Sequence, residues 1–283
     1  MGDNAKDGRM KNITEALKNK KALVCAGVAL VSFLIVVWLI VDYFIWTKKS
    51  EDKMEALRIE AKQVEVAITD SQGNDKSEAK TEAESVVNPY TEIFAQNEDM
   101  AAWLSVADTK MDYPVMQTME NETYYIDKDF YGNPDKAGCL LLDTDSSLTQ
   151  AGTTNLIIHG HNMKAGTMFG ELEKYQEEEY GKAHKDITLY TLEDKREYQV
   201  ISIFYSQVFY QTDTCFKYYN FFEAKTEEEF KDFYDNIKSM SLYDTGVTAE
   251  LGDSFITLST CSYHVEDGRF VVVAKEVNRE QYE

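Results

Sequence analysis

Short runs of apolar or alternating apolar and polar residues follow one another through residues 89–283, and this period of two is typical of β-strands. Residues that favour turns separate the runs. Helical patterns interrupt them at 89–102 and at 226–240, where Thr226 stands at the N-cap and Glu229 at the capping-box position. The eight runs are 103–107, 113–117, 138–142, 154–159, 187–192, 197–204, 254–260 and 269–277. The pattern predicts a mostly β domain with accessory helices, folded as a closed barrel or a sandwich.

A different pattern occupies the beginning of the chain. Residues 22–41 contain no charged side chain, and as a helix they match the thickness of the hydrocarbon core of a bilayer. No small-residue cleavage site of a signal peptide follows them, so we expect a retained transmembrane anchor over 22–46. More Lys and Arg precede the apolar run than follow it, which places residues 1–21 in the cytoplasm and the rest of the chain outside the cell.

The segment between the anchor and the β domain, residues 47–88, is predicted to be a helical stalk followed by a linker. Met54, Leu57, Ala61, Val64 and Ile68 form an amphipathic stripe, which fits either a short coiled coil or a single helix packed against the domain. Residues 70–88 lack aromatic side chains and are rich in acidic residues, so we expect a disordered linker there. The predicted catalytic domain is 89–283.

Charge and cysteine content narrow the possible functions. The net charge of −21 lies entirely in the region after the anchor, because the first 50 residues are net positive. So acidic a domain argues against nucleic acid as a partner and favours a soluble monomeric domain. Three of the four cysteines lie outside the apolar run, at 139, 215 and 261. This odd number leaves at least one thiol without an intramolecular disulfide partner.

Cys261 is the candidate nucleophile. It ends the run DSFITLSTC, and after a loop containing Asp267 and Gly268 the next run starts at Arg269. If the two runs form an antiparallel hairpin, Arg269 returns beside Cys261. A neighbouring cation favours the thiolate, and a guanidinium can also stabilise a developing oxyanion.

A thiol nucleophile also needs an imidazole to accept and return a proton. The run TTNLIIHGHNM places His159 and His161 around Gly160 at the end of a predicted strand, in a position that catalytic groups favour. Alternation puts both rings on the same side of an extended chain, so the pattern alone does not choose between them.

Several of these motifs resemble those of the class B sortases, in family order. They are TLSTC with an Arg eight residues later, GHNMKAGTMFGEL, DYPVMQ at 112–117 and YYIDKDFYGNPDKAG at 124–138. The resemblance covers about Pro89 to Val277. It implies a closed eight-stranded sortase-type β-barrel and a cysteine transpeptidase that joins secreted proteins to the cell surface of a Gram-positive bacterium.

By this resemblance, Cys261 is the nucleophile, His161 the general acid and base, and Arg269 the stabiliser of the oxyanion, while Ser259 and Ile126 line the peptide groove. The Cys attacks the Thr carbonyl of a sorting signal, and an amine of peptidoglycan or of a pilin lysine resolves the thioester. The resemblance implies no cofactor and no calcium dependence.

Two other functions compete with this interpretation. His159, His161, Cys261 and His264 could be four zinc ligands, although a zinc site gives no role to Arg269. The same fold could also serve as a non-catalytic, membrane-anchored surface module with an inert thiol. Of the remaining candidates, Cys139 is expected in the core, Cys215 is assigned no role, and His264 lies either against substrate or in solvent.

Overall fold

The computed structural model of this protein describes residues 3–72 and 87–282. The chain divides into two compact units, residues 1–49 and residues 50–283. Most of the predicted linker, 73–86, lies outside the described residues. A single helix, α1 (Asp3–Gln72), runs through the first unit and continues into the second.

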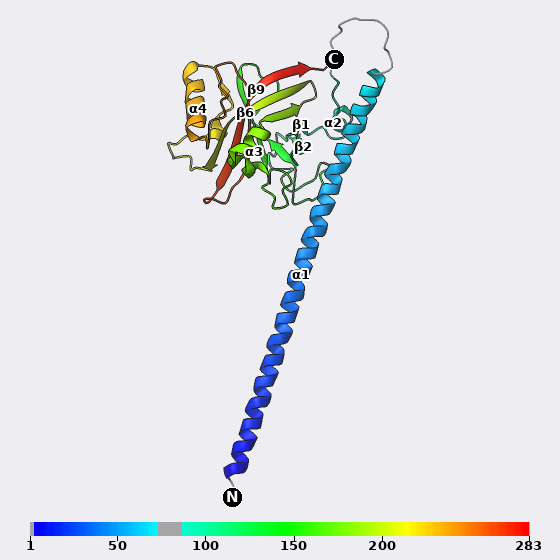
Figure 1. Ribbon diagram of the computed structural model, residues 1–283, viewed down its shortest axis with the longest axis vertical. Coiled ribbons are helices and arrows are strands. Elements are labelled where there is room, and N and C mark those ends of the chain that lie inside the picture. Colours follow the sequence, from blue (N-terminus) through cyan, green and yellow to red (C-terminus); the bar gives the residue numbers. More distant parts are fainter. Residues whose placement is uncertain (1–2, 73–86, 283) are drawn as a thin grey trace. The chain divides into compact units, whose positions relative to one another are not determined.

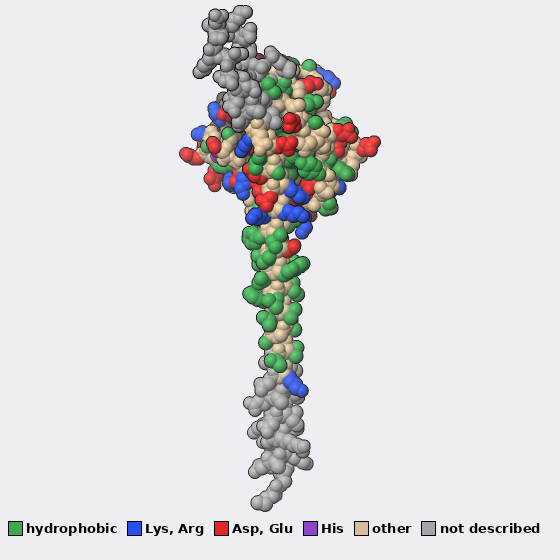
Figure 2. All heavy atoms as spheres, turned by 90° about the vertical axis from the view of Figure 1, so that its right-hand side faces the viewer, with side chains coloured by type: hydrophobic (Ala, Val, Ile, Leu, Met, Phe, Trp, Pro, Cys, Tyr) green, Lys and Arg blue, Asp and Glu red, His purple; other side chains and the backbone are tan. Residues whose placement is uncertain are grey.

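The apolar part of α1 belongs to the first unit. Its side chains from Leu23 to Ile45 are exposed, and Figure 2 shows them covering the visible face of the helix. In length and composition this helix is suited to cross a membrane. The finding is compatible with the predicted anchor.

The second unit is built on a β-barrel (Figure 1). Its strands are β1 (Met100–Ser105), β2 (Asp112–Met116), β3 (Leu140–Leu142), β4 (Thr153–Gly160), β5 (Asp186–Tyr190), β6 (Asp194–Gln207), β7 (Glu223–Ala224), β8 (Phe255–Cys261) and β9 (Gly268–Gln281). The order is β3-β2-β1-β5-β6-β9-β8-β4-β7, and β3 also pairs with β4. That last pairing closes a barrel of eight strands, with the two-residue β7 added beside β4.

The eight-stranded barrel predicted from the sequence is therefore confirmed. The long strands β6 and β9 pair along nearly their whole length, from Asp194 opposite Gln281 to Gln207 opposite Gly268. Residues 255–260 of β8 are buried and only Cys261, at its end, is exposed. The strand that carries the predicted nucleophile is thus fixed by the core up to the residue before the thiol.

The helix predicted at 226–240 is also confirmed, as α4 (Glu227–Met240). The Thr226 side chain accepts a hydrogen bond from the Glu229 amide, and the Glu229 carboxylate accepts one from the Thr226 amide. Phe230, Phe233 and Ile237 are buried in a cluster with side chains of β6, β8 and β9. Figure 1 shows α4 beside these strands at one side of the barrel.

The helix predicted at 89–102 is wrong for most of its length. Only α2 (Thr91–Phe94) is helical, and β1 already begins at Met100. Asn97 is the reason: its side-chain oxygen accepts from the Asp99 amide and its carbonyl accepts from the Met100 amide, which turns the chain. Three short helices had no clear sequence pattern: η1 (Leu172–Gln176), α3 (Glu178–Ala183) and η2 (Tyr218–Asn220).

The turns of α1 that begin the second unit, residues 50–63, pack on the barrel domain. Met54, Leu57 and Ala61 of the amphipathic stripe are buried. Arg58 donates from Nε to the carbonyl oxygen of Asp112 at 2.9 Å, at the start of β2. The packed unit therefore includes part of the segment that the sequence assigns to a stalk, as a single helix against the domain.

Candidate active site

Cys261 and Arg269 face each other across the hairpin of β8 and β9. They are direct partners in the antiparallel register, so their side chains emerge on the same face. The Ser262 amide donates to the Gly268 carbonyl at 2.9 Å and closes the loop between the strands. A side chain at Gly268 would come within 2.4 Å of the Ser262 carbonyl oxygen, so the tight turn requires glycine. The hairpin predicted from the sequence is present.

His161 lies at the same end of the barrel and is positioned by a different strand, β4. Strand β4 runs parallel to β8, with Gly160 opposite Thr260, and His161 follows directly after β4. The Thr260 hydroxyl donates to the Gly160 carbonyl at 2.7 Å, and the Asn162 side chain donates to the Cys261 carbonyl at 2.8 Å. These bonds tie the backbone of the His161 segment to that of Cys261.

Gly160 also has to be glycine. A Cβ there would lie 2.5 Å from Cδ2 of Leu140 and 2.6 Å from Cδ2 of Phe169, both in the packed interior. The small residue lets β4 end against the core, so that His161 leaves the strand at the rim of the barrel.

The His161 ring is oriented by a backbone carbonyl. Its Nε2 lies 2.9 Å from the carbonyl oxygen of Ile126, which can only accept, so Nε2 carries a proton. In the neutral ring, Nδ1 is then the nitrogen free to exchange a proton. Ile126 therefore contributes its backbone carbonyl to the site.

One groove collects all five predicted site residues. It has a volume of about 400 Å³ and an apolar lining, and its walls include Cys261, His161, Arg269, Ser259 and Ile126. The groove is also lined by His159, the second histidine that the sequence offered as a base, and by Glu122, Thr123, Leu141, Gly160 and Thr260. The Arg269 Nη1 donates to the carbonyls of Asp267 and Gly268, at 3.3 and 3.0 Å.

Ser259 lies deeper than a residue that binds peptide through its hydroxyl would. It is only 1% exposed, and its Oγ is 2.7 Å from the hydroxyl of Tyr218, which is itself 2% exposed. Burial raises the pKa of Tyr218 to about 12, although Ser259 and the charge of Arg269 act in the opposite direction. Tyr218 thus contacts β8 at Ser259, two residues before Cys261, and no local sequence signal pointed to it.

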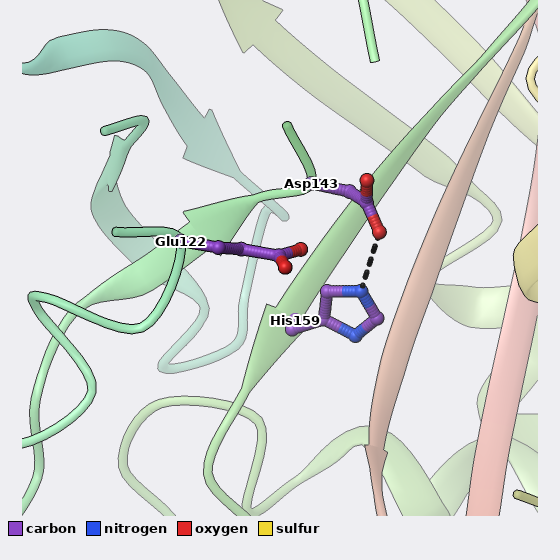
Figure 3. A group of neighbouring side chains, drawn as sticks. All are labelled: Glu122, Asp143 and His159. Atoms are coloured by element: carbon purple, nitrogen blue, oxygen red, sulfur yellow. Dashed lines mark hydrogen bonds and ion pairs between the residues drawn. The ribbon is translucent and has the colours of Figure 1, made fainter. Parts of the chain in front are cut away.

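His159 belongs to a separate group at the groove wall. Its Nε2 lies 3.4 Å from an Asp143 carboxylate oxygen, and Glu122 points toward the same place (Figure 3). Burial raises the pKa of Glu122, and the nearby charge of Asp143 raises it further. Among the described residues, this is the set of three whose ligand atoms all lie within 4.8 Å of one another.

The four zinc ligands of the alternative hypothesis do not form such a set in the described part of the chain. His161 is bonded to Ile126 and His159 to Asp143, while His264 Nδ1 lies 3.1 Å from the Ser262 hydroxyl. The geometry thus offers no shared point for the four side chains.

The cysteines outside the site behave as expected. Cys139 is buried, and burial together with the charge of Asp129 raises the pKa of its thiol. Cys215 is exposed, and all four cysteines are free thiols. His264 is exposed on the loop after Cys261, with its ring against Tyr205.

Comparison with known proteins identifies the family. The sortase domain model matches residues 104–277, which include every candidate site residue. The chain belongs to the sortase family, and is accordingly a cysteine transpeptidase that acts on surface proteins.

The relatives place it in class B. Sortase B of Listeria monocytogenes is 33% identical over 188 residues, 65% of this chain and 72% of the relative. Sortase B of Staphylococcus aureus is 28% identical over 245 residues, 86% of this chain and 93% of the relative. The crystal structure of Bacillus anthracis sortase B in complex with AAEK1 has a TM-score of 0.65 at 25% identity, with 83% of this chain and 99% of that chain covered.

Proposed function

We propose that Cys261 cleaves a C-terminal sorting signal and holds the acyl fragment as a thioester. The observation that carries this proposal is the single groove lined by Cys261, His161 and Arg269, which come from three separate stretches. The Cys261 sulfur attacks the carbonyl carbon of a Thr residue, and the carbonyl electron pair moves to oxygen. When the tetrahedral intermediate collapses, the C–N bond breaks and the amine leaves.

His161 provides the proton that the leaving amine needs. Because Nε2 donates to the Ile126 carbonyl, proton exchange with the thiol and with the amine falls to Nδ1. In the second half of the reaction an incoming amine gives its proton to the imidazole and attacks the thioester carbonyl, and the Cys261 thiolate leaves. The imidazolium then returns this proton to the Cys261 thiolate, so that the ring and the thiol both regain their starting protonation states.

Arg269 stabilises the negative charge on the substrate oxygen. Its direct register with Cys261 puts the guanidinium on the face from which the sulfur attacks. Within the part of the chain that the structure describes, its Nη1 donates to two neighbouring backbone carbonyls. Such bonds can be exchanged for bonds to an oxyanion, which are stronger because the acceptor is charged.

The substrates that this site would join are sorting-signal peptides of secreted proteins and an amine of peptidoglycan or of a pilin lysine. The shared fold is in keeping with the first of these, because a Staphylococcus aureus sortase B with the same fold, at a TM-score of 0.67 and 24% identity, was solved as a substrate complex. Ile126 and Ser259 form part of the groove in which the peptide would lie.

We further propose that residues 22–46 anchor the enzyme in the cell membrane, with residues 1–21 in the cytoplasm and the catalytic domain outside. The exposed apolar face of α1 and the excess of Lys and Arg before it support this topology. In a variant in which the exposed Cys25, Cys215 and Cys261 are replaced by Ser, a cysteine placed at residue 2 should be shielded from an impermeant maleimide on intact cells, whereas one placed at the exposed Glu120 should react. Labelling of residue 2 would show that the N-terminus lies outside the cell, opposite to the proposed topology.

The cleavage step is tested with Cys261→Ala in the full-length protein. This variant should fold as the wild type does and release no product from any pentapeptide that the wild type cleaves. Rapid alkylation of wild-type Cys261 near neutral pH is also expected, and an inert thiol would favour the non-catalytic surface module. Cleavage retained in the alanine variant would remove Cys261 from the mechanism.

The two histidines provide a matched comparison. His161→Ala should lower kcat by a factor of about 10²–10⁴, the usual contribution of a general acid and base. His159→Ala should have a much smaller effect, because His159 pairs with Asp143 at the groove wall. If the larger loss followed the change at His159, the two roles would have to be exchanged.

A further inference from the structure

The carbonyl that orients His161 belongs to a loop with many internal bonds. The Ile126 amide donates to Thr123, and the Cys139 amide donates to Tyr125, both at 3.0 Å. A Cβ at residue 138 would lie 2.2 Å from the Ile126 oxygen, so Gly138 leaves the space in which that carbonyl sits. The position of the His161 ring therefore depends on where this loop, residues 121–138, is held.

The loop is held by a lysine of α1. Lys53 donates from Nζ to Asp129 Oδ2 at 2.7 Å and lies 3.6 Å from Asp135 Oδ2. Asp129 in turn accepts from the amides of Tyr131 and Asn133, at 3.1 and 2.8 Å. One cation thus joins the helix to two points of the loop, and the first is three residues from Ile126.

These carboxylates are not surface groups. The side chains of Asp129 and Asp135 are 1% and 4% exposed, whereas the Lys53 side chain is 30% exposed. Burial opposes the ionisation of Asp129, yet Lys53 and the Asn133 amide keep its pKa below its ordinary value. A buried carboxylate that loses its cation is strongly destabilised, unlike one partner of a solvent-exposed pair.

The helix itself is fixed on the domain, so Lys53 is a rigid support. Met54 and Leu57 are 4% and 1% exposed, and Arg58 is bonded to the Asp112 carbonyl. The Arg58 guanidinium also lies 4.7 Å from the centre of the Tyr113 ring. Lys53 stands one residue before this buried row.

We propose that Lys53 is a positioning residue for the transpeptidase reaction, which acts through Asp129 and the Ile126 carbonyl on the His161 ring. The inference rests on the proposed role of His161. It makes the part of α1 around Lys53 a support of the catalytic apparatus, since the loop that orients the imidazole and lines the groove is tied to that helix.

The test compares Lys53→Met with Lys62→Met in the full-length protein in detergent. Lys62 is an exposed lysine of the same helix and serves as the matched control. Lys53→Met keeps most of the length of the side chain and removes the charged Nζ. It should lower kcat/KM for peptide cleavage about tenfold, mainly through kcat, because a small misplacement of a catalytic group is costly. Lys53→Arg should restore most of the loss, and Lys62→Met should match the wild type.

A readout independent of turnover comes from nitrogen NMR of the His161 ring. Lys53→Met should shift the Nε2 signal, whereas Lys62→Met should leave it in place. If Lys53→Met does not fold, Asp135→Asn removes only the longer of the two ion pairs and should shift the signal and lower kcat in the same direction, by less. Unchanged kcat and an unchanged ring signal in a folded Lys53→Met or Asp135→Asn variant would overturn the inference. An inactive wild type would instead count against the proposed function, and the ring signal would still decide the role of Lys53.

Discussion

The buried hydrogen bond between Tyr218 and Ser259 makes a quantitative prediction about the floor of the groove. Both residues are at most 2% exposed, and their hydroxyls lie 2.7 Å apart. Tyr218→Phe leaves the Ser259 hydroxyl without this partner, and Ser259→Ala does the same to Tyr218. A buried polar group left without a partner costs about 1–3 kcal/mol, so each single variant should lose that much stability.

The double variant should lose clearly less than the sum of the two single losses, because it leaves neither hydroxyl unpaired. Chemical denaturation of the three variants and the wild type gives the coupling free energy, which should be about 1 kcal/mol or more. In thermal unfolding, each kcal/mol corresponds to roughly 2–4 °C in Tm for a domain of this size. Strictly additive losses would show that the bond is absent in solution.

The same variants separate two roles for Ser259. If its hydroxyl is occupied by Tyr218, then Tyr218→Phe and Ser259→Ala should change kcat/KM alike, through the end of β8 that carries Cys261. If Ser259 instead binds the sorting peptide directly, its alanine variant alone should raise KM. A KM effect confined to Ser259→Ala would refute the structural role argued here.

Three further predictions concern charge, capping and metal. The pKa of Glu122 is raised in the folded state, so the folded protein loses stability relative to the unfolded chain as pH rises and Glu122 ionises. Glu122→Gln should therefore have a larger free energy of unfolding than the wild type near neutral pH and the same free energy well below pH 4. Chemical denaturation at several pH values measures this difference. Equal stability of Glu122→Gln and the wild type at both pH values would contradict this prediction. Thr226→Ala should lower the free energy of unfolding by about 1 kcal/mol, because it removes the capping oxygen of α4. Thr226→Ser keeps that oxygen and should not lower it. Equal losses in the two variants would show that the cap contributes nothing. Dialysis against a strong chelator should leave peptide cleavage unchanged. If cleavage were lost on dialysis and restored by added zinc, the zinc-site hypothesis would be favoured instead.

The strands were predictable because their signal is local. Alternation and turn residues located all eight barrel strands, and the capping box located α4. The helix expected at 89–102 failed for a reason that periodicity does not record: the side chain of Asn97 forms a turn with the Asp99 amide and also contacts the Phe130 carbonyl, far along the chain.

The part of the candidate site that could be predicted from the sequence is the part formed by residues close together along the chain. A hairpin alone places Arg269 opposite Cys261, and the register agrees. His161 meets them only because β4 and β8, a hundred residues apart, pair in parallel, and for that step the family resemblance was needed. The contributions of Tyr218, Glu122 and Lys53 depend on tertiary contacts without a motif of their own.

The most direct test of the central claim is the identity of the residue that carries the acyl fragment. Full-length protein isolated from cells and trapped with acid during turnover should yield, by mass spectrometry, a Cys261 peptide joined through a thioester to a fragment that ends in Thr. The Cys261→Ala protein should carry no such adduct. A fragment attached to Cys215 or Cys139, or turnover in which Cys261 never becomes acylated, would contradict the account.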